Sequence, residues 1–263
     1  MTRNMNLILL SDSDFITPHR VRLTDRRMNH IRDILKAQRG QDLTVGRING
    51  LMGQGTLVNQ KTDYIELEVK LDTKPPEALP LTLILALPRP PMLKRILFSS
   101  AQLGVKKIII LNFNRVEKSL WNSSSLKPQA ITEQLVLGLE QAKDTIMPEV
   151  TLKKRFKPFV QDELPKLIKG NLALVAHPAK IPSRGEFPSP KGPIASTSQS
   201  FVNAERFRRG NPQTPTTLII GPEGGILDYE IELLKSAGCQ PIDLGPRILR
   251  TESVLPYVVG KIF

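Results

Sequence analysis

Two short aliphatic runs that each end in Gly-Pro constrain the fold of this chain more than any other feature. The run 218–220 stops at Gly221, and the run 242–244 stops at Gly245. Such runs are typical of strands in a parallel sheet, whose two faces are both buried beneath helices. Ligands of open α/β sheets bind outside the carboxyl ends of the strands. The two glycine turns therefore predict one floor for a ligand, because glycine lets the backbone approach it closely.

From residue 79 onward, the chain alternates such strands with amphipathic helices. This alternation predicts an α/β domain built on a parallel sheet. Strands are expected at 81–87, 105–111, 149–152, 171–176, 218–220 and 240–244, and helices at 92–103, from Pro128 to Ala142, at 159–168 and at 228–237.

The first part of the chain has a different pattern, in which short strands are joined by glycine turns. We expect strands at 6–10, 42–50, 55–58 and 64–71, and one helix at 24–38 that Gly40 ends. This pattern predicts a small β-barrel. A proline-rich linker follows at 74–80, and it predicts two domains, 1–74 and 75–263. The segment 181–216 is rich in Pro, Ser, Gly and Arg, which indicates a mobile insertion.

Composition excludes several other classes of protein. A chain of 263 residues has room for two domains with real cores. The apolar run 7–10 is too short for a signal peptide or a membrane span. The single Cys239 and three scattered histidines favour neither a disulfide framework nor a metal site. We expect a cytoplasmic protein with no membrane and no metal.

The net charge of +12 is concentrated in two blocks. Residues 20–39 hold seven basic and two acidic side chains, and residues 150–211 hold twelve basic and four acidic ones. Concentrated positive charge favours a polyanionic partner such as a nucleic acid. The alternative is a solvated surface on a basic protein.

The glycine turns also belong to a longer pattern. Gly221-Pro-Glu-Gly-Gly225, followed by Leu244-Gly-Pro-Arg-Ile-Leu-Arg-Thr-Glu252, resembles the RsmE family of 16S ribosomal RNA methyltransferases within the SPOUT superfamily. The resemblance covers nearly the whole chain. It includes His30-Ile-Arg-Asp-Ile-Leu35, Gln102-Leu-Gly-Val105, and Glu140-Gln141 with Pro148-Glu149.

The resemblance implies an activity and a fold. The activity is methylation of N3 of a uridine in the 16S RNA of the small ribosomal subunit, with S-adenosylmethionine as donor, by a homodimer. The fold is a SPOUT methyltransferase domain whose C-terminal chain forms a deep trefoil knot around the parallel sheet, preceded by a PUA-like β-barrel. Two other functions stay open: a non-catalytic RNA-binding ribosome-assembly factor with the same fold, and a tRNA methyltransferase.

Three positions depart from the family pattern. Gln102 stands where relatives carry a carboxylate, Asp144 where many carry arginine, and Leu227 where a serine usually caps a helix. The last change leaves Asp228 as the expected cap. Because the glycine turns are intact, these departures bear on RNA contacts and packing more than on the methyl donor.

The resemblance also implies a set of donor-binding residues. Two of them have alternatives: His177 as a strand-end residue without a ligand contact, and Glu223 as a residue that bonds its own turn or faces the RNA. The expected donor-binding residues are Ala176, His177, Gly221, Glu223, Gly225, Leu244, Gly245, Ile248 and Leu249.

Two further groups complete the predicted site. Arg250 is the expected catalytic cation, with a ligand clamp as the alternative. Glu252 is the candidate base, although a glutamate in a first helical turn more often complements the helix dipole. In the N-terminal part, four residues are expected to contact RNA phosphates: Arg22, Arg26, His30 and Arg32. For His30 the alternative is a packed residue without an RNA contact.

Overall fold

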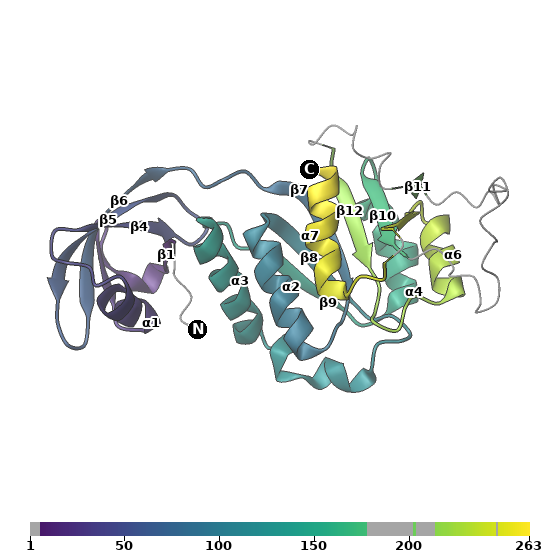
Figure 1. The fold of residues 1–263 in the computed structure, drawn as a ribbon, viewed down its shortest axis with the longest axis horizontal. Helices are drawn as coiled ribbons and strands as arrows, with labels where there is room; N and C mark the ends of the chain where they lie inside the picture. The colour runs from purple at the N-terminus through teal and green to yellow at the C-terminus, as the bar shows by residue number, and fades with distance from the viewer. Residues whose placement is uncertain (1–5, 178–201, 204–213, 246) are drawn as a thin grey trace. The chain divides into compact units, whose positions relative to one another are not determined.

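The structure is a computed structural model that describes residues 6–177, 202–203, 214–245 and 247–263, and its strands form two sheets (Figure 1). Most of the predicted insertion 181–216 lies outside the described residues.

The N-terminal sheet has six strands in the order β1-β4-β5-β6-β3-β2. Its neighbouring strands pair antiparallel, except β1 and β4, which are parallel. The strands β2 and β3 were not predicted from the sequence because they are very short and carry exposed polar residues. The strands are β1 Ile8–Leu10, β2 Phe15–Thr17, β3 Arg20–Leu23, β4 Asp42–Arg47, β5 Met52–Gln60 and β6 Ile65–Thr73.

The predicted helix at 24–38 is shorter in the structure. The helix α1, Arg26–Asn29, begins after Asp25, whose side chain accepts a hydrogen bond from the Arg27 backbone N–H. One π-helical turn, η2, continues it over His30–Ile34. The chain then leaves helical geometry because Lys36 has a φ of 49°. Ile31 is fully buried in the core of this part of the chain.

The second sheet has seven strands in the order β11-β13-β10-β12-β7-β8-β9. The four pairings from β11 to β7 are all parallel, as the sequence predicts. Every residue of β12 is buried. The strands are β7 Leu79–Ala86, β8 Val105–Leu111, β9 Glu149–Lys153, β10 Leu172–Ala176, β11 Val202–Asn203, β12 Thr216–Ile220 and β13 Gln240–Asp243.

The remaining helices follow the sequence pattern closely. The helix α3 begins at Pro128. Proline suits the first helical position because a backbone N–H there would have no partner within the helix. The longer helices are α2 Pro90–Gln102, α3 Pro128–Ala142, α6 Asp228–Ser236 and α7 Thr251–Ile262. Shorter turns are η1 Asp12–Asp14, η3 Lys118–Asn122, η4 Ser124–Leu126, α4 Phe156–Pro158, η5 Phe159–Glu163 and α5 Leu164–Leu167.

The expected cap at Asp228 is wrong, because Asp228 is the first helical residue of α6 and Leu227 is the N-cap. Leucine has no side-chain acceptor. The carboxylate of Glu230 replaces it and accepts a hydrogen bond from the Leu227 N–H at 3.0 Å. The same carboxylate accepts the Asn114 N–H at 2.8 Å. Glu230 is fully buried, and it therefore joins the start of α6 to the loop after β8.

The described chain forms two compact units that are interleaved in sequence. The first comprises the residues up to Leu79, Leu93–Lys106 and Ser123–Glu149, and the second comprises Pro80–Met92, Lys107–Asn122 and the described residues from Val150 onward. The division at residue 74 remains a prediction. The second unit holds most of the parallel sheet and all of the cavities described next.

Candidate functional site

Three neighbouring strands of the parallel sheet end at the same level. Ala176, the last residue of β10, is paired with Ile220 of β12 and with Ile242 of β13. The backbone N–H of His177 also donates to the Ile242 carbonyl at 3.1 Å. The loops that follow the three strands therefore leave from one edge of the sheet, where α/β proteins bind ligands.

Glycine backbone geometry shapes two of these loops. Gly225 has a φ of 82° and Gly245 a φ of 108°, values that side chains other than glycine rarely adopt. The Gly225 N–H donates to the Pro222 carbonyl at 2.8 Å, and the Gly245 N–H donates to Asp243 Oδ1 at 3.1 Å. Both loops are thus tightly turned at the sheet edge.

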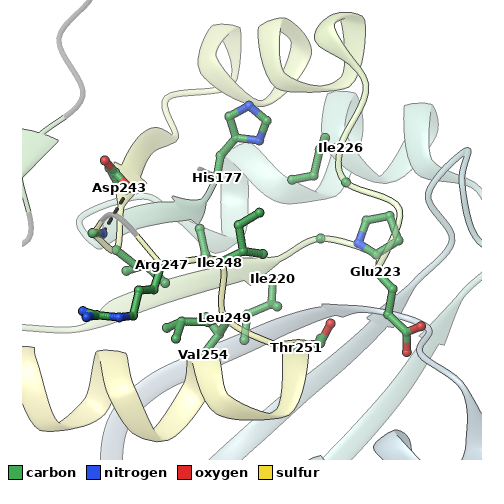
Figure 2. A pocket seen from close by; sticks show the side chains of 16 residues that line it. His177, Ile220, Glu223, Ile226, Asp243, Arg247, Ile248, Leu249, Thr251 and Val254 are labelled. Atoms are coloured by element: carbon green, nitrogen blue, oxygen red, sulfur yellow. Dashed lines mark hydrogen bonds between the residues drawn. The ribbon is translucent and has the colours of Figure 1, made fainter. Parts of the chain in front are cut away.

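These loops and the start of α7 line an open cavity, which we call the first cavity (Figure 2). In Figure 2, Asp243 and Arg247 lie at one end of it, and Glu223 lies at the other. All nine residues predicted to hold a donor line this cavity. The sequence analysis missed the other lining residues, which are Ile220, Pro222, Ile226, Asp243, Arg247, Thr251 and Val254.

Gly221 is required here by packing. A Cβ atom at this position would lie 2.4 Å from Cγ1 of Ile226, which is buried. Ile226 therefore occupies the space over Gly221 and lines the first cavity beside it. The absence of a side chain at Gly221 lets the loop fold back onto the end of β12.

A second cavity shares one wall with the first. Its lining includes the two predicted catalytic residues, Arg250 and Glu252, neither of which lines the first cavity. Four residues line both cavities: Glu223, Ile248, Leu249 and Thr251. The second cavity is completed by Arg89, Pro91 and Met92, which the sequence analysis did not single out.

Charged groups gather at the second cavity and beside it. Arg89 Nε lies 3.8 Å from Glu223 Oε2, and Arg89 Nη2 lies 3.4 Å from Glu117 Oε1. Arg115 donates a short hydrogen bond to the carbonyl of Gly224. Two arginines thus hold the loop 222–225 from the side of the β7 and β8 loops.

The predicted RNA-binding residues lie together on β3, α1 and η2, and their side chains also have partners within the protein. Arg22 pairs with Glu66 at 2.7 Å and lies over the Tyr64 ring, 4.5 Å from its centroid. The hydrogen bond from Arg22 lowers the pKa of Glu66. Nearly half of the Arg22 side-chain surface stays exposed.

Arg26 pairs at 2.8 Å with Glu140 of α3, a carboxylate that is almost completely buried. Burial raises the pKa of Glu140, while Arg26 acts in the opposite direction. Arg32 donates to the Thr62 carbonyl at 3.0 Å. His30 is buried, and burial lowers its pKa, which favours the packing alternative for this residue over a phosphate contact.

No group of three or more His, Cys, Asp or Glu side chains within the described residues is arranged to hold a metal ion. No helix among the same residues is long and apolar enough to cross a bilayer.

Comparison with known families gives one match that spans most of the chain. The family model for an RNA methyltransferase domain matches residues 75–262. Among curated proteins, Ribosomal RNA small subunit methyltransferase E of Treponema pallidum is 26% identical over 252 residues, which is 95% of this chain and 87% of that protein. Ribosomal RNA small subunit methyltransferase E 1 of Borreliella burgdorferi is 25% identical, over 95% of this chain and 93% of that protein.

Solved structures share the fold. A Legionella pneumophila protein with bound S-adenosylmethionine superposes with a TM-score of 0.70 at 22% identity, covering 99% of this chain and 97% of that chain. Ribosomal RNA small subunit methyltransferase E from Neisseria gonorrhoeae, also bound to S-adenosylmethionine, gives a TM-score of 0.67 at 20% identity, covering 98% and 96%. Both comparisons show an α/β fold with a parallel sheet.

Proposed function

The chain belongs to the RNA methyltransferase family, and from this premise we propose that it methylates N3 of a uridine in the 16S RNA of the small ribosomal subunit, with S-adenosylmethionine as donor. One observation carries the proposal: the nine residues expected to bind the donor, from three separate loops, line a single cavity. That cavity lies where α/β folds bind ligands.

The lining of the first cavity fits the chemistry of the donor. Adenosyl compounds combine a flat apolar base with polar edges, and ligand sites of this kind are lined by apolar side chains with a few polar groups. Ile220, Ile226, Leu249 and Val254 supply apolar walls, and the loops at Gly221 and Gly245 supply backbone donors and acceptors. The bound donor would supply an electrophilic methyl group on a sulfonium.

The residues of the second cavity suit the acceptor side of the reaction. Uridine N3 carries a proton at neutral pH, which it loses before or during attack. Arg250 would stabilise negative charge that develops on the imide oxygens. Glu252 is the candidate proton acceptor, with complementing the dipole of α7 as the alternative. Methyl transfer is an in-line displacement, so the donor and the acceptor base must lie next to each other. The two cavities are adjacent, which would place the donor beside the acceptor.

The finer features of fold and assembly are part of the same proposal. We propose a deep trefoil knot formed by the C-terminal chain, a PUA-like barrel in the N-terminal sheet, a homodimer and a cytoplasmic location. The knot is supported by the strand order of the parallel sheet, in which β10 lies between the later strands β12 and β13. Ile248, which is 76% exposed at both cavities, supports a second subunit that covers it.

Mass spectrometry of 16S RNA tests the proposed function. RNA from a strain that lacks the gene should lose one N3-methyluridine, and the purified protein with S-adenosylmethionine should restore it to small subunits from that strain. An unchanged nucleoside profile in the deletion strain, or methylation that appears only on transfer RNA, would reject the proposal.

A further inference from the structure

We infer that the second cavity binds the acceptor base, and that Arg89 is the residue in it that selects uracil over cytosine. The inference rests on the proposed function, and it assigns roles to Arg89 and Met92 that the sequence motifs do not contain. Three observations carry it: the shared wall between the cavities, the apolar side chains within the second cavity, and the placement of the Arg89 guanidinium.

The shared wall limits where an acceptor can enter. Reacting atoms must come within roughly 3–3.5 Å of each other, so the acceptor has to approach a donor in the first cavity through adjoining space. The second cavity adjoins it through Glu223, Ile248, Leu249 and Thr251. It also contains Arg250, which lies in the turn before α7.

The second cavity offers apolar contact for a flat ring. Pro91 and Met92 come from the first turn of α2, and Ile248 and Leu249 come from the loop before α7. A methionine thioether makes favourable contacts with aromatic rings and adapts to their shape. Apolar side chains from two separate segments would therefore hold a pyrimidine, while the polar groups decide which pyrimidine is accepted.

Arg89 supplies the polar discrimination. Its guanidinium lies 3.4 Å from Glu117 and 3.8 Å from Glu223, and 64% of the side-chain surface remains exposed. A guanidinium has five N–H donors and no acceptor, so these two contacts leave donors for a ligand. Uracil presents carbonyl acceptors on both sides of N3, whereas cytosine presents an amino donor on one side. A donor-only side chain that faces position 4 of the ring therefore favours uracil, whose O4 accepts, over cytosine, whose N4 amino group donates.

The alternative is that Arg89 forms only a surface ion pair, which would contribute little to stability or function. The two roles differ in what they do to RNA kinetics. An acceptor-site residue changes KM for RNA and base selectivity, whereas a surface pair changes neither.

Steady-state and single-turnover methylation of small subunits from the deletion strain tests the inference, with the variants Arg89→Ala, Arg89→Lys and Met92→Ala. The matched control is Lys94→Ala, which removes an exposed cation of α2 that does not line the cavity. Loss of a charged hydrogen bond costs roughly ten- to a hundredfold in binding. We expect Arg89→Ala to raise KM for the subunit by at least about tenfold, Arg89→Lys to restore part of it, and Lys94→Ala to match wild type.

Two further measurements separate the possible failures. Affinity for S-adenosylhomocysteine, measured by calorimetry, should stay within about twofold of wild type in every variant. Subunits carrying cytidine at the modified position should be rejected by wild type and discriminated less strongly by Arg89→Ala. Wild-type KM and wild-type selectivity in both Arg89→Ala and Met92→Ala would overturn the inference while the proposed function stands. A wild-type protein that methylates no RNA would overturn both.

Discussion

Glu223, Ile248 and Leu249 show what a single residue can do at this site, because each lines both cavities. Their positions in the motifs predicted contacts with the donor. The structure shows that each of them also lines the second cavity. Sequence spacing could not reveal this, because it shows which loop a residue belongs to but not which cavities its side chain lines. For the same reason Arg89 and Met92, which lie more than a hundred residues before the glycine turns, were not predicted.

Arg250 is expected to act on the rate and not on donor binding. Arg250→Ala should slow single-turnover methylation by roughly a hundredfold or more, because an oriented cation that stabilises developing charge is lost. Arg250→Lys keeps the charge and loses the planar guanidinium, so its rate should lie between those of wild type and Arg250→Ala. Calorimetry with S-adenosylhomocysteine serves as the control. A wild-type rate for Arg250→Ala at saturating RNA and donor would show that Arg250 only clamps a ligand.

Gly221 and Ile226 should behave as a coupled pair. Gly221→Ala places a methyl group against the buried Ile226, and such overpacking costs roughly 1–3 kcal/mol of unfolding free energy. The double variant Gly221→Ala/Ile226→Ala removes the clash and should recover more stability than additivity allows. Denaturant unfolding of the single and double variants measures the coupling. Strictly additive effects would mean that the methyl group added at position 221 does not meet Ile226.

At the scale of elements, strong patterns were predicted well and weak ones were not. The strand β8 and the helices α3 and α6 were predicted within a residue or so, because their apolar spacing is clear in the sequence. The helix at 24–38 was predicted too long, since the left-handed geometry of Lys36 is not encoded by a glycine or asparagine. The loops expected to bind the donor were recognised by their glycines, because the tight backbone turns at Gly225 and Gly245 favour that residue.

Glu230 is expected to determine how firmly α6 and its preceding loop are held. Glu230→Ala leaves the N–H groups of Asn114 and Leu227 without their carboxylate, and we expect a loss of about 2–4 kcal/mol in unfolding free energy. Glu230→Gln keeps one acceptor and should lose less. Glu232→Ala is the control, because this neighbouring glutamate is exposed on the same helix. Equal stability of the Glu230→Ala and Glu232→Ala variants would contradict the anchoring role.

The two buried glutamates of the first unit should give opposite pH dependences. Burial raises the pKa of Glu140 above its ordinary value of 4.5, so its contribution to stability is present below that value and is lost as the pH rises through the folded-state pKa. The hydrogen bond from Arg22 lowers the pKa of Glu66, so its contribution is present above 4.5 and is lost as the pH falls.

Urea unfolding across this pH range measures the difference. Relative to wild type, Glu140→Gln should gain unfolding free energy as the pH rises, and Glu66→Gln should lose it. The same trend in both variants would show that one of the two pairs is not formed as described.

At the scale of the whole molecule, the predicted RNA-binding arginines and the two cavities belong to different units. Arg22 and Arg26 are in the first unit, and both cavities are in the second. If the first unit holds RNA through phosphates, its contribution should be electrostatic and should not depend on the donor.

Salt dependence tests this division of labour. The double variant Arg22→Ala/Arg26→Ala should weaken RNA binding and reduce the slope of log K against log salt by roughly one unit per lost phosphate contact. The control is Glu66→Gln/Glu140→Gln, which breaks the same two ion pairs and keeps both cations. A wild-type slope in the arginine variant, or an equal loss in the control, would assign the effect to folding and not to phosphate contacts.

The order of strands in the parallel sheet has a consequence for the newborn chain. β10 lies between β12 and β13, and β7 pairs with β12, so two strands wait for partners that are made later. β12 leaves the ribosome some 130 residues after β7. At roughly 5–20 residues per second this delay is on the order of ten seconds, during which β7 stays without this neighbour. The first cavity is completed only when Val254 of α7 has been synthesised. Methylating activity is therefore gained late in translation, and β7 has to be kept from pairing with other chains until then.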